Sequence, residues 1–399
     1  MSDFIPRADE AKAALAHLNT IDLDDPETHK DAISHCQATI TALQKPGDLA
    51  LESFTTFTIF PCLRTASDLR IFERPRDGPL TLQQLAEQTG AETSLLARLL
   101  RVITGIGVIH ESGPETYTAT PTSHILGSPA FAAGFRMFGK IGPNLQSFPD
   151  YLQATKYRNP SDSDSSSGIF QSCFHTDHSF FSWLAANPSI AHDFNTFQTT
   201  KRNRQHWSES YPVWARITEG VDTLHSDRPL LVDVGGSVGH GLRAVKAKFP
   251  HPLQTGQLIL QDQQSVIETI QADMRDPMIE YIPYDFFTPQ MVKGARVYLL
   301  KHIIHNWPDD KVVSILRNVT CGMRRGYSKL WLFGGIMPEW QAPRILSRMD
   351  IVMMVFMAAM ERTERHITEL LRRAGLVVTG VDIVMEGYGV IEAMLQVEA

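Results

Sequence analysis

Cysteine, basic charge and long apolar runs are all scarce in this chain of 399 residues. Its four cysteines lie far apart with no C-x-x-C pair, so neither a disulfide framework nor a zinc or other metal site is indicated. The 37 Lys and Arg residues are outnumbered by 44 Asp and Glu residues, and the net charge of −7 argues against a nucleic-acid partner. No apolar run reaches membrane-spanning length, and the first residues lack signal-peptide character. We therefore expect a reduced, cytoplasmic protein with no membrane partner.

The dinucleotide-binding pattern G-x-G-x-x-G is also missing, because its second glycine would fall on Ser237. The chain has D-x-G-G-x-x-G instead, with Gly235, Gly236 and Gly239 between an apolar strand and a helical spacing of apolar residues. Glycine allows a sharp turn and a close approach to a ligand, because it has no Cβ. This form suits a nucleoside without a pyrophosphate, and Asp262, at the end of the next apolar run, is placed to accept its ribose hydroxyls. An ordinary strand, turn and helix is the alternative.

Strand and helix patterns alternate from residue 230 onward, which predicts an α/β fold with a mostly parallel, doubly wound, Rossmann-like sheet. Before it, residues 80–125 combine two helices with a hairpin around Ser112-Gly113-Pro114, a winged-helix arrangement. Its second helix is too apolar to read a DNA groove, so packing or dimerisation is expected. The expected domains are a helical and winged-helix dimerisation domain (1–130), a helical connecting and substrate-pocket region (131–210) and an α/β domain (211–399).

A carboxylate and an aromatic ring follow a short predicted strand at Asp285 and Phe286. Such a carboxylate can accept a hydrogen bond from the amine of an adenine while the ring covers the face of the base. A buried aromatic residue beside a turn aspartate is an equally good interpretation of the spacing.

A second polar segment, from Lys301 to His305, follows another predicted strand. Ligands of open α/β sheets bind at the carboxyl ends of the strands, and this position distinguishes His305 from the other histidines of the chain. Asp309 or Asp310 is expected to cap the helix that follows.

Taken together and in order, these motifs resemble those of class I S-adenosylmethionine-dependent O-methyltransferases of the plant caffeate and fungal secondary-metabolite kind. The resemblance covers most of residues 60–399 and includes Glu361-Arg362-Thr363. It implies S-adenosyl-L-methionine as cofactor, a small-molecule substrate and a homodimer. The cofactor-binding positions that it implies, with Gly239 completing the turn, are Gly235, Gly236, Asp262, Asp285, Phe286 and Lys301.

The same resemblance makes His305 the general base and Glu361 a carboxylate that orients it. Three departures stand out, and the smallest is Asn306, which stands where the family has the aspartate of His-Asp-Trp. Gly334 occupies the position of a second family glutamate, and the polar Thr196 lies where the family usually has a methionine that grips a flat acceptor. The remaining candidates for the substrate pocket are Phe194, Met353, Met354 and Met357.

The leading hypothesis is therefore methyl transfer to a hydroxyl of a small aromatic or polyketide-type secondary metabolite. An alternative comes from fungal relatives of the same fold that act as pericyclases or dehydratases. There the cofactor is not consumed, and Lys301 and Thr196 would polarise the substrate. A protein that binds without catalysis is a third possibility.

Overall fold

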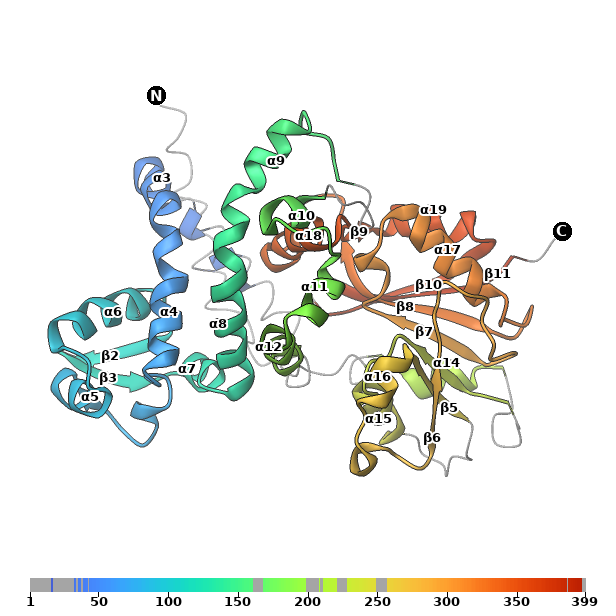
Figure 1. Cartoon of the computed structure of the whole chain (residues 1–399), viewed down its shortest axis with the longest axis horizontal. Helices are drawn as coiled ribbons and strands as arrows, with labels where there is room; N and C mark the ends of the chain where they lie inside the picture. The colour runs from blue at the N-terminus through green and yellow to red at the C-terminus, as the bar shows by residue number, and fades with distance from the viewer. Residues whose placement is uncertain are drawn as a thin grey trace. The chain divides into compact units, whose positions relative to one another are not determined.

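The structure is a computed structural model that describes residues 16, 32–33, 35–36, 39–41, 43–160, 168–198, 208, 211–220, 228–248, 257–385 and 387–396. It contains two compact units, Met1–Ser128 and Pro129–Ala399, which we describe separately (Figure 1). The division into three regions at residues 130 and 210 stays a prediction. Within the described ranges, every helix is too short or too polar to cross a lipid bilayer.

The first unit combines short helices with a three-stranded antiparallel sheet in the order β1-β3-β2. Helix α5 begins at a capping box, in which Thr81 and Gln84 exchange side-chain and backbone hydrogen bonds, and it ends at Gly90 with a φ of 71°. The two predicted helices and the hairpin are confirmed. The elements are α3 (Pro46–Thr55), η1 (Thr56–Thr58), α4 (Ile59–Asp68), η2 (Arg74–Arg76), β1 (Leu80–Thr81), α5 (Leu82–Thr89), α6 (Thr93–Gly105), β2 (Ile109–Gly113), β3 (Thr116–Ala119) and α7 (Pro121–Leu126).

The second unit begins with helices that pack around aromatic side chains. Phe170 stacks on Phe174 with ring centroids 4.4 Å apart, and Phe356 of α18 lies 5.9 Å from Phe170. Gly134 lets α8 approach α12, because a Cβ at that position would lie 2.6 Å from the ring of Phe197. The helices are α8 (Pro129–Ile141), η3 (Gly142–Ser147), α9 (Phe148–Ala154), α10 (Ile169–Phe174), α11 (Phe180–Ala186), α12 (Pro188–Gln198) and α18 (Arg344–Met357).

An α/β sheet forms the rest of this unit, with strand order β10-β11-β8-β7-β4-β5-β6 and β9 paired with β8. Strands β4 to β8 pair in parallel, whereas β11 runs antiparallel to both β8 and β10. The predicted doubly wound sheet is confirmed, with an antiparallel edge. Its strands are β4 (Leu231–Val234), β5 (Leu258–Asp262), β6 (Ile279–Pro283), β7 (Val297–Lys301), β8 (Lys329–Met337), β9 (Arg362–Thr363), β10 (Leu376–Met385) and β11 (Tyr388–Leu395).

Both faces of the sheet are covered, which is why the central strands are mostly apolar. On one face the apolar side chains of α17 and α19 pack against the strands, and on the other those of α14, α15 and α16 (Figure 1). These helices and the remaining short turns are α14 (Val213–Thr218), α15 (His240–Lys246), α16 (Gln264–Glu268), η5 (Ala272–Met274), η6 (Ile304–Asn306), α17 (Asp309–Thr320) and α19 (Glu364–Arg373).

The order of the parallel strands reverses at β4, an interior strand of the sheet. From β4 the chain proceeds to β5 and β6 on one side, and then returns to β7 on the other side. The connections that follow β4 and β7 therefore diverge, and an open α/β sheet binds its ligands at such a point. Gly235 follows β4, and Lys301 is the last residue of β7.

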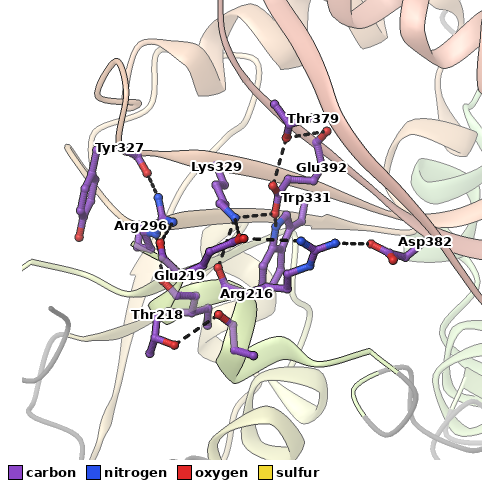
Figure 2. Close-up of polar contacts among 12 residues, drawn as sticks. Arg216, Thr218, Glu219, Arg296, Tyr327, Lys329, Trp331, Thr379, Asp382 and Glu392 are labelled. Atoms are coloured by element: carbon purple, nitrogen blue, oxygen red, sulfur yellow. Dashed lines mark hydrogen bonds and ion pairs between the residues drawn. The ribbon is translucent and has the colours of Figure 1, made fainter. Parts of the chain in front are cut away.

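The opposite end of the sheet holds a network of charged side chains, in which Lys329 and Glu392 are buried and Glu219 is exposed (Figure 2). Lys329, the first residue of β8, lies 2.8 Å from Glu219 and 3.0 Å from Glu392. Glu392 also accepts hydrogen bonds from Trp331 at 2.9 Å and from Thr379 at 3.1 Å. The network thus joins the end of α14 to β8, β10 and β11.

Candidate active site

The glycine turn after β4 requires the residues that it has. Gly235 has a φ of 74° and Gly239 one of 82°, in the left-handed region that favours glycine. A Cβ on Gly236 would lie 2.3 Å from Leu260 and 2.6 Å from a carboxylate oxygen of Asp233. The backbone of the turn therefore lies directly against β5 and Asp233, and no side chain fits between them.

Asp262, at the end of β5, is hydrogen-bonded to this turn. Its Oδ2 accepts a hydrogen bond from the backbone N–H of Ser237 at 2.7 Å, and its Oδ1 accepts one from Gln263 at 2.8 Å. Burial raises the pKa of Asp262, although these two N–H groups oppose the rise. A carboxylate has about four acceptor positions, so both oxygens retain capacity for further donors such as hydroxyls.

The buried Asp233 and the half-buried Lys301 lie near the turn and interact electrostatically as opposite charges. Asp233 is 2% exposed, and its Oδ1 has no hydrogen-bond partner among the described residues. The Nζ of Lys301 lies 3.5 Å from the Cβ position of Gly241, in the first turn of α15. The site thus contains a buried carboxylate oxygen with an unused acceptor position.

The aromatic ring of Phe286 borders the glycine turn. Its Cε1 lies 3.7 Å from the Cβ position of Gly235, and its ring packs edge to face with Trp307 at 5.9 Å. The exposed Asp285 accepts a hydrogen bond from the backbone of Phe287 at 2.9 Å through Oδ1. The structure therefore brings Phe286 to the turn that was predicted to hold the nucleoside.

His305 pairs with Glu361. The Nδ1 of His305, in turn η6 after β7, lies 2.8 Å from Oε1 of Glu361, which precedes β9. The side chains are 13% and 1% exposed, respectively. The ring of His302 lies 5.5 Å from that of His305. Because Glu361 accepts at Nδ1, Nε2 of a neutral His305 keeps its lone pair.

Two glycines of β8 border this pair in different ways. A Cβ on Gly335 would lie 2.5 Å from Oε2 of Glu361 and 2.7 Å from Leu346. The nearest atom to a Cβ on Gly334 is Nδ1 of His302, at 4.0 Å. Gly335 is thus required by packing, whereas a Cβ at position 334 would have no neighbour closer than 4.0 Å.

The expected helix cap after His305 is wrong. Helix α17 begins at Asp309 itself, and Pro308 is its N-cap, so neither Asp309 nor Asp310 caps it. The Asp309 carboxylate instead pairs with Arg362 at 2.9 Å and with His366 at 2.8 Å. The Asp309 carboxylate is therefore occupied by charge-assisted hydrogen bonds to distant residues and not by the first turn of the helix.

The predicted pocket residues lie on two helices of the aromatic cluster. Met353 and Met357 of α18 are buried in it, and Met354 and Phe194 pack against it. Thr196 is half-buried, also on α12 with Phe194. Apolar packing accounts for the methionines and Phe194 here, so contact with a substrate stays a prediction for all five.

Comparisons with known proteins match both parts of the chain. Residues 194–377 match the family model of the O-methyltransferase domain, and residues 51–128 match that of the O-methyltransferase dimerisation domain. The chain is 32% identical over 397 residues to the O-methyltransferase penC of Penicillium thymicola, covering 97% of each chain.

This chain belongs to the O-methyltransferase family. Its fold is similar to a solved structure described as a pericyclic reaction enzyme, with a TM-score of 0.85 and 26% identity over 97% of this chain and 100% of the other. It is equally similar to LepI in complex with SAM, with a TM-score of 0.85 and 26% identity over 98% and 100%. The cofactor of this O-methyltransferase family member is S-adenosyl-L-methionine.

The residues of this O-methyltransferase site fit that cofactor. Gly235 and Gly236 place no side chain over the turn, and Asp262 has acceptor capacity for ribose hydroxyls. The unused oxygen of Asp233 and the nearby Phe286 supply an acceptor and an apolar ring.

Sequence reasoning missed two residues of the site. Asp233 stands in the glycine motif, but nothing in the pattern distinguishes it from a residue that merely ends a strand. Arg362 follows Glu361 directly, and that adjacency was the available signal.

Proposed function

We propose that this chain transfers a methyl group from S-adenosyl-L-methionine to a hydroxyl of a small aromatic or polyketide-type secondary metabolite, with His305 as general base. The observation that carries the proposal is the 2.8 Å contact between His305 and Glu361, beside the strand ends that hold the glycine turn. A histidine with one nitrogen fixed by a carboxylate is suited to removing a proton with the other.

Gly235, Gly236, Gly239 and Asp262 would hold the nucleoside, with Phe286 against the adenine. In the proposal, Asp285 accepts from the exocyclic amine and Lys301 interacts with the polar end of the cofactor. When bound, the cofactor supplies an electrophilic methyl group on a sulfonium. The site residues then need only hold the acceptor oxygen in line and remove its proton.

His305 would take that proton at Nε2, because Glu361 engages Nδ1. Glu361 also stabilises the imidazolium that forms, since a buried carboxylate interacts strongly with a neighbouring cation. Most of the acceleration comes from position, because holding two reacting atoms at near-attack distance supplies about 7–11 kcal/mol. Phe194, Met353, Met354 and Met357 would form the apolar wall that holds the acceptor, and Thr196 would donate a hydrogen bond to it.

A second function is favoured by one specific observation, the glycine at position 334. His305 has the Glu361 carboxylate beside it, but Gly334 supplies no second carboxylate where the family resemblance implies a glutamate. A pericyclase or dehydratase would not need a strong base, and it would use Lys301 and Thr196 to polarise a substrate carbonyl. The likeness to a pericyclic reaction enzyme is compatible with this alternative.

Product mass distinguishes the two functions. The protein is incubated with S-adenosyl-L-methionine and a panel of phenolic and polyketide-derived hydroxyaromatic compounds. Methyl transfer adds one methyl group and releases one S-adenosylhomocysteine per product. An isomerised or dehydrated product with the cofactor unconsumed would replace our proposal by the alternative.

The variant His305→Ala tests the role of the base. We expect the methyl-transfer rate to fall by about 100-fold or more, because a positioned general base contributes 10²–10⁴-fold. The affinity for S-adenosylhomocysteine, measured by calorimetry, should stay within about threefold, since His305 lies outside the glycine turn. Full activity in the variant would show that another group removes the proton.

We further propose that the chain is a homodimer through its dimerisation domain. In that unit, Phe54 and Phe57 are 77% and 72% exposed, next to the 65% exposed Leu51. Large exposed apolar side chains that cluster in this way mark interaction surfaces. Sedimentation should give twice the mass of one chain, and Phe54→Asp combined with Phe57→Asp should yield monomers.

A further inference from the structure

Arg362 is buried beside the proposed base and contacts the segment that carries it. The residue is 2% exposed and forms β9 together with Thr363. Its guanidinium donates to the backbone carbonyl of Ile304 at 2.7 Å and to that of Trp307 at 2.7 Å. It also pairs with Asp309 at 2.9 Å.

The carbonyls of Ile304 and Trp307 flank His305 along the chain. Ile304 is the first residue of turn η6 and Trp307 is the residue that follows it, so His305 lies between two carbonyls held by one planar group. A guanidinium has five donors in a rigid fork, and here they fix the backbone of the turn relative to β9. An ammonium group has no such geometry.

The same two-residue segment fixes the His305 ring. Glu361 directly precedes Arg362, and its Oε1 contacts Nδ1 of His305. The backbone N–H of Glu361 in turn donates to Asp350 at 2.8 Å. Residues 361 and 362 therefore hold both the ring and the backbone of His305, and a shift of either residue would move the imidazole.

The charges around Arg362 support this arrangement. Three carboxylates, those of Asp309, Glu361 and Asp350, favour the charged guanidinium, although burial lowers the pKa of Arg362. Asp309 is held from its other side by His366. Arg362 and the buried Glu361 also attract each other as opposite charges, which favours the position of Glu361 beside His305.

We propose that Arg362 is a positioning residue for methyl transfer: it holds turn η6 so that His305 Nε2 faces the acceptor hydroxyl. This inference rests on the proposed function of His305. It assigns to Arg362 no contact with substrate or cofactor.

The test uses the full-length protein with S-adenosylhomocysteine bound and compares Arg362→Lys with the matched control Arg365→Lys. Arg365 is close in sequence, but its side chain is 84% exposed and pairs with Glu339 at the surface. The first readout is the hydrogen-bonded ring N–H signal of His305 in nitrogen-15 NMR, which is assigned by its loss in His305→Gln. The second is kcat and KM, measured with the phenol that is methylated in the mass assay.

In Arg362→Lys we expect the His305 N–H signal to be lost. We also expect kcat to fall by about 100-fold, since a misplacement of about 1 Å has that effect. The KM for S-adenosyl-L-methionine and the affinity for S-adenosylhomocysteine should stay within about threefold, because the glycine turn is untouched. Arg365→Lys should match the wild type in every readout.

An unchanged His305 signal and an unchanged kcat in folded Arg362→Lys would overturn the inference while leaving methyl transfer intact. If the wild type transfers no methyl group, the proposed function fails, and the NMR comparison still decides whether Arg362 holds His305. Should Arg362→Lys not fold, Asp309→Asn weakens the same contact from its other end. An unchanged His305 signal there would equally refute the inference.

Discussion

Asp233 and Lys301 carry opposite charges that burial affects in opposite directions. Burial raises the pKa of Asp233 to about 6, with Asp262 adding to the rise and the Lys301 ammonium opposing it. Burial lowers the pKa of Lys301, and Asp233 opposes that change. Each group thus stays charged near neutral pH partly because the other is present, so a substitution of one alters both.

This coupling predicts how stability depends on pH. Because the folded pKa of Asp233 exceeds its unfolded value near 4, the folded state keeps a proton that the unfolded chain releases. The stabilising contribution is complete below about pH 4 and is lost as the pH rises to about 6, by on the order of 3 kcal/mol. In Asp233→Asn this part of the slope should disappear, as measured by urea denaturation of the cofactor-free protein between pH 4 and pH 7.

The exposed Asp150, in the first turn of α9, supplies the control for that measurement. Asp150→Asn should keep the wild-type slope. Identical slopes for wild type and Asp233→Asn would mean that Asp233 is not the group that couples folding to pH.

At the scale of elements, strand β8 shows why two adjacent glycines differ in role. Successive residues of a strand face opposite sides of the sheet, so neighbours meet different surroundings. Gly335 faces Glu361 and Leu346, and Gly334 faces the space beside His302. The strand thereby packs against the Glu361 carboxylate on one side only.

The matched pair of variants Gly335→Ala and Gly334→Ala tests this distinction. In Gly335→Ala the new methyl group would overlap Glu361 and Leu346, so we expect a loss of about 1–3 kcal/mol in unfolding free energy together with reduced activity. Gly334→Ala should change stability by less than about 0.5 kcal/mol. Urea denaturation and the methyl-transfer assay measure both effects. Equal losses in the two variants would contradict the packing assignment.

For the molecule as a whole, the second unit has its network of ion pairs at one end of the sheet and the candidate active site at the other. The network of Lys329, Glu219 and Glu392 lies at the amino ends of the parallel strands (Figure 2), whereas the glycine turn and His305 follow their carboxyl ends. Apolar packing on both faces connects the two ends. Changes in the network are therefore expected to affect folding without affecting the site.

Lys329→Met provides the corresponding test. It leaves the buried carboxylate of Glu392 without its cation, and removing one partner of a buried pair destabilises by about 3–5 kcal/mol. The affinity for S-adenosylhomocysteine of the folded variant should equal that of the wild type. The exposed Lys140 of α8 is the control, since Lys140→Met should leave stability nearly unchanged. A loss of cofactor affinity with normal stability would refute the separation.

Much of this arrangement could be predicted from local patterns. Strands β4 to β8, β10 and β11, the glycine turn and the hairpin of the first unit all follow from apolar spacing and turn residues, which act within a few positions of the chain. The predicted helix cap at Asp309 was wrong because the contacts of this residue are long-range in sequence. Its partners Arg362 and His366 lie more than 50 positions away, so no local rule includes them.

The amino-acid sequence by itself determined the order of elements, the family and the residue types of the site, because periodicity and motif spacing are properties of neighbouring residues. Only the tertiary structure decided which charges meet. The contacts of Glu361 with His305, of Arg362 with turn η6 and of Asp233 with the glycine turn depend on how the ends of separate strands come together. Burial then sets the strength of those contacts, and burial is a property of the folded chain as a whole.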